Sequence, residues 1–300
     1  MLNKTIRECF SQATEIIKEQ RSRGKPEFPT SIDFIDEMTG GMKRGEIWII
    51  SGKTGSGKTS LALQVARSFA DNPDNTILFL SLEMRGWQLA LRMYCEMYEA
   101  SYFDLINGYI DIDLNFMEKF KEYVTNIDFE ICEEGYTFEE IEKIIKTSYE
   151  TKQPDIIFLD FVQQVEWKNF GDERVALMEY IRKIKETANK TNIGFVIVSQ
   201  IRRLPSGADY NRPPDLYDLK GSGSLEQMAD KVLFIYKTIT ESRKTNETYE
   251  QYYIDIAKNR QGKIGKQQVI FEGEHYKFKN KNIGNPLIDK IVKEFDATEL

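Results

Sequence analysis

A glycine-rich segment near residue 50 has the residue types and spacing of a phosphate-binding loop. Gly52, Gly57, Lys58 and Thr59 fit the pattern GxxxxGK[ST] within SGKTGSGKTS. Such glycines let successive backbone N–H groups point at phosphate oxygens, while the lysine reaches the β- and γ-phosphates and the threonine holds Mg²⁺. The segment therefore predicts a site for a nucleotide triphosphate and Mg²⁺. The residues expected to bind the nucleotide are Gly52, Thr54, Gly55, Ser56, Gly57, Lys58, Thr59 and Ser60.

Hydrolysis of a bound triphosphate also needs an acid for the metal ion and a group that positions the attacking water. Asp160 ends the apolar run DIIFLD, Glu83 ends TILFLSLE and Gln200 follows GFVIVS. If these runs are parallel strands, the three side chains share the carboxyl edge of the sheet, where ligands bind. We expect Asp160 to complete the Mg²⁺ shell, Glu83 to polarise the water and Gln200 to sense the γ-phosphate. Ordinary caps or solvated loop residues also occur at such positions, and that alternative stays open.

A parallel sheet with intervening helices is needed to bring these residues together, and the hydrophobic pattern predicts one. Short apolar runs occupy 46–50, 76–82, 155–160, 194–199 and 231–236. Helical stretches occupy 59–70, 87–99, 138–150 and 173–190. This alternation indicates an α/β fold with a mostly parallel central sheet and helices on both faces. After residue 236, the runs YYIDIAK, QQVIFEG and HYKFK predict an antiparallel C-terminal edge.

The composition excludes several other classes of protein. The 300 residues are 41% hydrophobic and 30% charged, which is typical of a globular domain. The net charge of −7 confines any nucleic-acid contact to local basic patches. No apolar run reaches the ~18 residues of a membrane span, and three scattered cysteines argue against disulfides and zinc sites. His275 is the only histidine, which excludes multi-histidine metal sites. These features favour a cytoplasmic protein.

Several short motifs, taken in order, resemble the motor domain of DnaB-type replicative helicases. They are TSIDFIDEMTGGMKRGEIWIISGKTGSGKT, LSLEM, DIIFLDFVQQ, VIVSQ, DLKGSGSLEQMAD and IAKNRQGKIG, between about residues 28 and 280. The resemblance implies a RecA-like P-loop ATPase domain at 29–280, a linker-type helix and linker at 1–28, and a tail at 281–300. In the family, the helical collar domain precedes the linker helix, and this sequence is expected to lack it. The roles given above for the P-loop and for the acid and amide residues carry over to Lys58, Thr59, Glu83, Asp160 and Gln200.

The same resemblance implies a function. It predicts an ATP-hydrolysing hexameric ring that moves along single-stranded DNA and unwinds duplex DNA during replication, in a bacterial or phage-infected cell. The direction expected by resemblance is 5′ to 3′, and a helicase loader or a primase is expected as a partner. Two alternatives stay open. One is a RecA-like ATPase that remodels or signals without unwinding, and the other is a non-motor paralogue that regulates a full-length helicase.

Two further sites follow from the resemblance. The segment 256–266 carries four cations and no acid. In the family, a lysine and an arginine from this segment reach the γ-phosphate held by the neighbouring subunit, so Lys258 and Arg260 are expected to be catalytic in trans. The segment 201–226 is expected to contact the backbone of single-stranded DNA through cations and exposed amides. The residues expected to bind DNA are Arg202, Arg203, Arg212, Lys220, Gly221 and Gly223.

Composition alone leaves ordinary surface loops as an alternative for both segments. Residues 3–20 add a last expectation, because their apolar side chains recur three and four apart and predict an amphipathic helix. These side chains are Ile6, Cys9, Phe10, Ala13, Ile16 and Ile17. From the residues alone, such a helix packs either on its own domain or on a neighbour, and both alternatives stay open. In the family, a helix at this place packs on the adjacent motor domain and holds the ring together.

Overall fold

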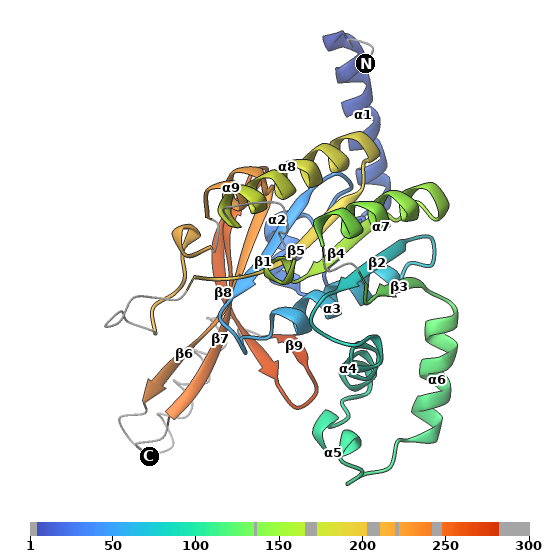
Figure 1. Cartoon of the computed structure of the whole chain (residues 1–300), viewed down its shortest axis with the longest axis vertical. Helices are drawn as coiled ribbons and strands as arrows, with labels where there is room; N and C mark the ends of the chain where they lie inside the picture. Colours follow the sequence, from blue (N-terminus) through green and yellow to red (C-terminus); the bar gives the residue numbers. More distant parts are fainter. Residues whose placement is uncertain are drawn as a thin grey trace, which may run out of the picture.

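Nine strands form a single sheet in the computed structural model, which describes residues 5–134, 137–165, 173–202, 211–219, 222–241 and 248–281. The strands are β1 (Ile47–Gly52), β2 (Thr76–Ser81), β3 (Asp128–Cys132), β4 (Ile156–Asp160), β5 (Gly194–Gln200), β6 (Lys231–Glu241), β7 (Thr248–Asn259), β8 (Gly265–Glu272) and β9 (Lys277–Asn280). Their order across the sheet is β3-β2-β4-β5-β1-β6-β7-β8-β9 (Figure 1). The strands from β3 to β6 in this order pair in parallel, and β6 to β9 pair antiparallel. The predicted fold class is confirmed.

Helices cover both faces of the sheet. They are α1 (Ile6–Arg23), α2 (Asp33–Thr39), α3 (Lys58–Ala70), α4 (Gly86–Tyr98), α5 (Tyr102–Ile106), α6 (Leu114–Thr125), α7 (Phe138–Thr151), α8 (Glu173–Thr191), α9 (Ser222–Met228) and the 3₁₀ helices η1 (Val162–Gln164) and η2 (Leu216–Asp218). Alternate strand residues point to opposite faces. Trp48 and Ile50 of β1 therefore join the core under α3 and α4, whereas Ile47 and Ile49 join the core under α7 and α8.

The register of the parallel strands brings their carboxyl ends to one edge. Gly52 at the end of β1 pairs with Gln200 at the end of β5. Ser81 at the end of β2 pairs with Asp160 at the end of β4. The loops that follow these strands therefore meet at the same edge, as ligand sites in open α/β sheets require.

Four elements differ from the sequence-based expectations. The strand β3 and the helices α5 and α6 were not predicted; β3 is a half-buried edge strand whose sequence DFEIC contains charged residues, so it lacks a continuous apolar run. The strand β6 extends beyond the predicted 231–236 because β7 pairs with it along its whole length. Figure 1 shows this pair continuing as a two-stranded ribbon beyond the rest of the sheet.

The predicted N-terminal helix is present as α1, and it lies apart from the body of the domain (Figure 1). Thr5 and Glu8 form a capping box at its start, and Gly24 ends it in a left-handed conformation with φ of 67°. The helix therefore ends at Arg23, a little past the predicted 3–20. Its apolar stripe is not buried, since Ile6 is 86% and Phe10 is 70% exposed. In the part of the chain described above, no helix is both long enough and apolar enough to cross a membrane.

Candidate nucleotide site at the carboxyl edge of the sheet

The glycine-rich loop joins β1 to α3 at the carboxyl edge. Gly55 and Gly57 have φ of 75° and 90°, a region of backbone space that favours glycine. A Cβ on Gly52 would lie 2.2 Å from the carbonyl oxygen of Ile235, so a side chain does not fit there. The helix α3 begins at Lys58, and its first N–H groups have no partner within the helix. The loop thus has the backbone form of an anion-binding site.

A cleft of about 470 Å³ opens beside this loop. Glu83, Asp160 and Gln200 line it together, from the ends of three different strands. The structure therefore brings together the predicted acid and amide side chains. The residues of the loop that line the cleft are Thr54, Gly55, Gly57, Lys58, Thr59 and Ser60. Gly52 and Ser56 were also predicted to bind nucleotide but do not line the cleft. Ser56 is buried, and its Oγ would lie 2.6 Å from a Cβ on Gly52.

Lys58 and Asp160 form the buried, charged part of the cleft. The Nζ of Lys58 donates to the carbonyl oxygen of Lys53 at 2.9 Å. Burial lowers the pKa of Lys58, although the charges of Asp160 and Glu83 oppose this. Burial likewise raises the pKa of Asp160 to about 6, although the nearby Thr59 hydroxyl opposes this. The cleft therefore holds a cation and an anion that are both poorly solvated.

The carboxylate of Asp160 suits a bound cation. Both of its oxygens are buried, and neither makes a hydrogen bond of normal geometry with a described residue. Such buried groups cost free energy unless a partner is supplied. No group of three or more His, Cys, Asp or Glu side chains in the described ranges could hold a metal by itself. The residues therefore fit Mg²⁺, which needs only one or two protein oxygens beside phosphate and water.

Gln163 is a site residue that the sequence reasoning missed. It lies in η1, directly after β4, and its Oε1 accepts the backbone N–H of Gln200 at 3.1 Å. Its Nε2 donates to Oγ of Ser199 at 2.8 Å. One amide side chain thus joins the end of β5 to the turn that follows Asp160. The only sequence signal was the glutamine pair that follows DF in DIIFLDFVQQ.

Arg92 of α4 was also missed. It lines the cleft, and its positive charge acts to lower the pKa of Asp160. Its guanidinium lies 4.1 Å from the centre of the Tyr276 ring, which belongs to the turn between β8 and β9. Its Nε is buried without a hydrogen-bond partner among the described residues. A second cation therefore faces the cleft with an unused donor. Nothing in the sequence separates this arginine from the ordinary arginines of other helices.

Lys258 and Arg260 do not join this cleft. The backbone N–H of Arg260 donates to the carbonyl oxygen of Asp230 at 3.0 Å, and Asp230 in turn bonds to Ile47 at the start of β1. The P-loop follows Gly52 at the other end of β1. The first and last of the six residues of β1 are five steps apart, and at about 3.3 Å per step the two places are separated by ~17 Å. The two predicted finger residues thus lie near the edge of the sheet opposite to the nucleotide cleft of their own chain.

The predicted DNA-binding residues are only partly described. Three of them lie outside the described residues: Arg203, Lys220 and Gly221. Gly223 is exposed at the start of α9. The guanidinium of Arg212 binds both oxygens of the buried Asp218, at 2.7 and 2.8 Å, and Arg202 lies 3.6 Å from the same carboxylate. Arg212 therefore has a structural partner, whereas the side chain of Arg202 is 56% exposed.

Together, the sheet order and the cleft define a P-loop nucleotide-binding protein of the RecA-like class. The chain matches the DnaB-like helicase C terminal domain family over residues 28–280, and it belongs to that family. This confirms the resemblance found in the motifs. The chain is 29% identical over 298 residues to the replicative DNA helicase DnaB of Helicobacter pylori (strain ATCC 700392 / 26695), covering 93% of this chain and 61% of that protein.

Solved structures agree on the fold. The ATPase domain of G40P is 25% identical with a TM-score of 0.78, covering 94% of this chain and 100% of that one. A DnaB-like replicative helicase, studied with its interactions with primase, is 24% identical with a TM-score of 0.76, covering 94% and 68%. The chain spans 61% and 56% of the length of two curated relatives, so it corresponds to part of those proteins.

Proposed function

We propose that residues 29–280 are the motor domain of a ring-shaped, ATP-hydrolysing translocase that moves along single-stranded DNA and unwinds duplex DNA in replication. The observation that carries the proposal is the buried Asp160 carboxylate, which makes no hydrogen bond of normal geometry with a described residue, beside Lys58 and Thr59 in a cleft. Such a carboxylate is costly in a resting fold and useful beside Mg²⁺ and phosphate. Membership of the helicase family supports the remainder of the proposal.

The charged and polar cleft residues described above have the following roles in this proposal. The P-loop N–H groups and Lys58 bind the phosphates, while Thr59 and Asp160 hold Mg²⁺, which neutralises developing charge when it is bound. Glu83 polarises the attacking water and Gln200 contacts the γ-phosphate. Arg92, whose Nε has no hydrogen-bond partner among the described residues, adds a donor to the phosphates.

The position of the finger residues supports hydrolysis between subunits. Lys258 and Arg260 lie ~17 Å from their own P-loop along β1, so they can serve only a phosphate held by another copy. The exposed apolar stripe of α1 supports contact between copies, because burying exposed apolar side chains against a partner gains free energy. We propose a hexameric ring in which α1 packs on the adjacent motor domain.

The remaining partners follow from the family. Single-stranded DNA is proposed to run along segment 201–226, with Arg202 and Gly223 as contacts among the described residues. A helicase loader or a primase is proposed as a further partner, in the cytoplasm of a bacterial or phage-infected cell. The direction of movement, 5′ to 3′, is proposed on the same basis.

Strand separation is the experiment that tests the proposal. Purified chain is mixed with a forked DNA duplex, ATP and Mg²⁺, and release of one strand is followed by fluorescence. We expect unwinding that needs hydrolysable ATP and is lost in Glu83→Gln. DNA-stimulated ATPase without strand release would instead favour a RecA-like ATPase that remodels or signals without unwinding.

A further inference from the structure

The two predicted finger residues are held by the end of α9. The Nζ of Lys258 donates to the carbonyl oxygen of Glu226, and Nη2 of Arg260 donates to the carbonyl oxygen of Gln227. The last carbonyl groups of a helix have no partner within the helix, and a cation at that end also interacts favourably with the helix dipole. Lys258 and Arg260 therefore cap α9 from β7 and the turn that follows it.

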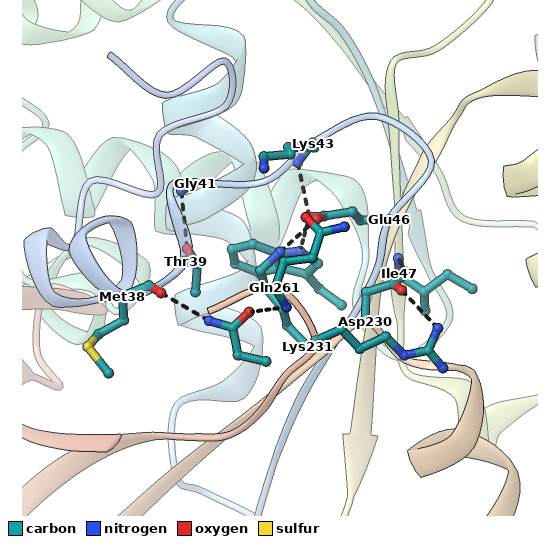
Figure 2. Close-up of polar contacts among 12 residues, drawn as sticks. Met38, Thr39, Gly41, Lys43, Glu46, Ile47, Asp230, Lys231 and Gln261 are labelled. Carbon is teal, nitrogen blue, oxygen red and sulfur yellow. Dashed lines mark hydrogen bonds and ion pairs between the residues drawn. The ribbon is translucent and has the colours of Figure 1, made fainter. Parts of the chain in front are cut away.

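The carboxylate of Asp230 also contacts the guanidinium of Arg260. The carbonyl group of Gln227 and the carboxylate of Asp230 are together called the seat of Arg260. The Asp230 Oδ1 lies 3.2 Å from Nη1 of Arg260. Its Oδ2 accepts from Nζ of Lys185 at 2.8 Å and from the N–H of Ile47 at 2.9 Å. Figure 2 shows Asp230 beside Ile47. Only 13% of the Asp230 side chain is exposed, and the backbone N–H of Ile47 in β1 holds the carboxylate in place, while Lys185 and Arg260 both contact it from the side.

The helix α9 connects this seat to the other predicted sites of the same chain. Its first turn contains the exposed Gly223, a predicted DNA contact, and its last turn supplies the carbonyl groups that hold the finger residues. Before it, Leu219 forms a β-bridge with Ile201, which directly follows Gln200. The predicted DNA contact and the carbonyl groups that hold Lys258 and Arg260 therefore lie within one helix of seven residues.

We propose that Asp230 is a positioning residue, which aims Arg260 at the γ-phosphate of the neighbouring subunit. DNA contact at the start of α9 acts on hydrolysis through this seat. The inference rests on the proposed function, because it needs fingers that act in trans. Asp230 is ~17 Å from its own P-loop along β1, so its loss affects kcat at the neighbouring site and leaves ATP affinity unchanged.

Mixed assemblies of two variants test this inference. Lys58→Ala subunits lose their phosphate site but keep their fingers, and Arg260→Ala subunits keep their site but lose the arginine. Fingers acting in trans restore DNA-stimulated ATPase when the two are mixed. Asp230→Asn is then added to the Lys58→Ala subunit. Every intact nucleotide site with a neighbouring Arg260 then depends on an Arg260 that has lost the Asp230 carboxylate. We expect the restored kcat to fall about 10- to 100-fold, the range expected for a misplaced catalytic group, with KM for ATP unchanged.

The outcomes are distinct. Equal recovery with and without the Asp230→Asn substitution overturns the inference and leaves the trans finger standing. No recovery in the first mixture overturns both the inference and the proposed catalysis in trans. A fall in kcat that is the same with and without DNA contradicts the coupling through α9.

Two further variants control for folding. Lys185→Met is the matched control, because it removes the other cation of Asp230 and leaves the contact with Arg260. We expect a Lys58→Ala subunit that also carries Lys185→Met to restore DNA-stimulated ATPase as fully as Lys58→Ala alone. Asp230→Glu keeps the charge but displaces the carboxylate by one methylene, and it replaces Asp230→Asn if that variant does not fold. Full recovery with Asp230→Glu, at unchanged melting temperature and assembled mass, likewise contradicts the inference.

Discussion

The backbone N–H of Gln200 donates to Oε1 of Gln163 at 3.1 Å, which ties the end of β5 to η1 beside the buried Asp160. The residue proposed to contact the γ-phosphate is therefore held by a side chain that follows the proposed metal ligand. The same Gln163 donates to Ser199, so it fixes two successive residues of β5. Changes at the metal site and at Gln200 are thus linked by one amide.

Gln163→Leu tests this link. The substitution keeps the approximate size of the side chain but leaves the Gln200 N–H and the Ser199 hydroxyl without their partner. We expect kcat for ATP to fall about 10-fold, since a small displacement of a positioned group costs one to two powers of ten. Affinity for a fluorescent ATP analogue should be unchanged. Gln164→Leu is the matched control because Gln164 is the exposed neighbour in η1, and an equal loss in both variants contradicts the link.

Asp160 gives the apo protein a distinct pH dependence. Its pKa is about 6 in the folded chain against an ordinary value of 3.8, because burial disfavours the charged form. The folded state therefore binds this proton more tightly than the unfolded state, and stability falls as pH rises from about 4 to about 6. We expect Asp160→Asn to stabilise the apo protein at pH 8, by roughly 2–3 kcal/mol.

Thermal unfolding at pH 4 and pH 8, without nucleotide or Mg²⁺, measures this effect. The melting temperature of Asp160→Asn should exceed that of the parent at pH 8 and equal it at pH 4. Magnesium and ATP should stabilise the parent but not the variant. A variant less stable than the parent at pH 8 shows that the carboxylate is satisfied in the apo fold.

The two arginines that contact Asp218 should behave differently. Burial acts to raise the pKa of Asp218, but hydrogen bonds from Arg212 and the Asp215 N–H hold it below its usual value. Arg212→Ala removes a bidentate partner from a buried carboxylate, so we expect it to destabilise the fold by about 1–3 kcal/mol. Arg202→Ala should leave the melting temperature unchanged and weaken binding of single-stranded DNA, with the salt dependence reduced by about 0.7 in log–log slope. Denaturant unfolding and a salt titration of DNA binding separate the two.

The exposed stripe of α1 should control assembly. Ile17 is 64% exposed, so a charge there costs the isolated chain little. We expect Ile17→Asp to lower the assembled mass measured by light scattering, with the melting temperature of the separated chain unchanged. Ser11→Asp places the same charge on the opposite face of the helix and should leave the assembled mass unchanged. Equal masses for both variants contradict a role for the stripe.

The fold was largely predictable because its signals are local. Continuous apolar runs marked the buried parallel strands, and α3 begins at Lys58, within one residue of its predicted start. The nucleotide cleft was also predictable from local signals, namely the glycine pattern of the loop and the acids at the ends of strands. The edge strand β3 was missed because a half-buried strand needs no continuous apolar run.

The missed site residues share a different cause. Arg92 enters the cleft because α4 packs beside α3, and a helix pattern does not show which of its arginines faces inward. Arg260 is held by the backbone carbonyl group of Gln227 and by the carboxylate of Asp230, and Lys258 is held by the carbonyl group of Glu226, all about 30 residues earlier in the chain. Contacts to backbone atoms carry no residue-type signal, so only the folded structure reveals them.

Steady-state ATPase of the purified chain, at several protein concentrations and with or without single-stranded DNA, tests the central claim most directly. If the nucleotide site is completed by Lys258 and Arg260 of a neighbour in a DNA-gated ring, turnover per subunit rises with protein concentration and rises further with DNA. Turnover that is independent of both would leave the P-loop as a nucleotide site and contradict the motor.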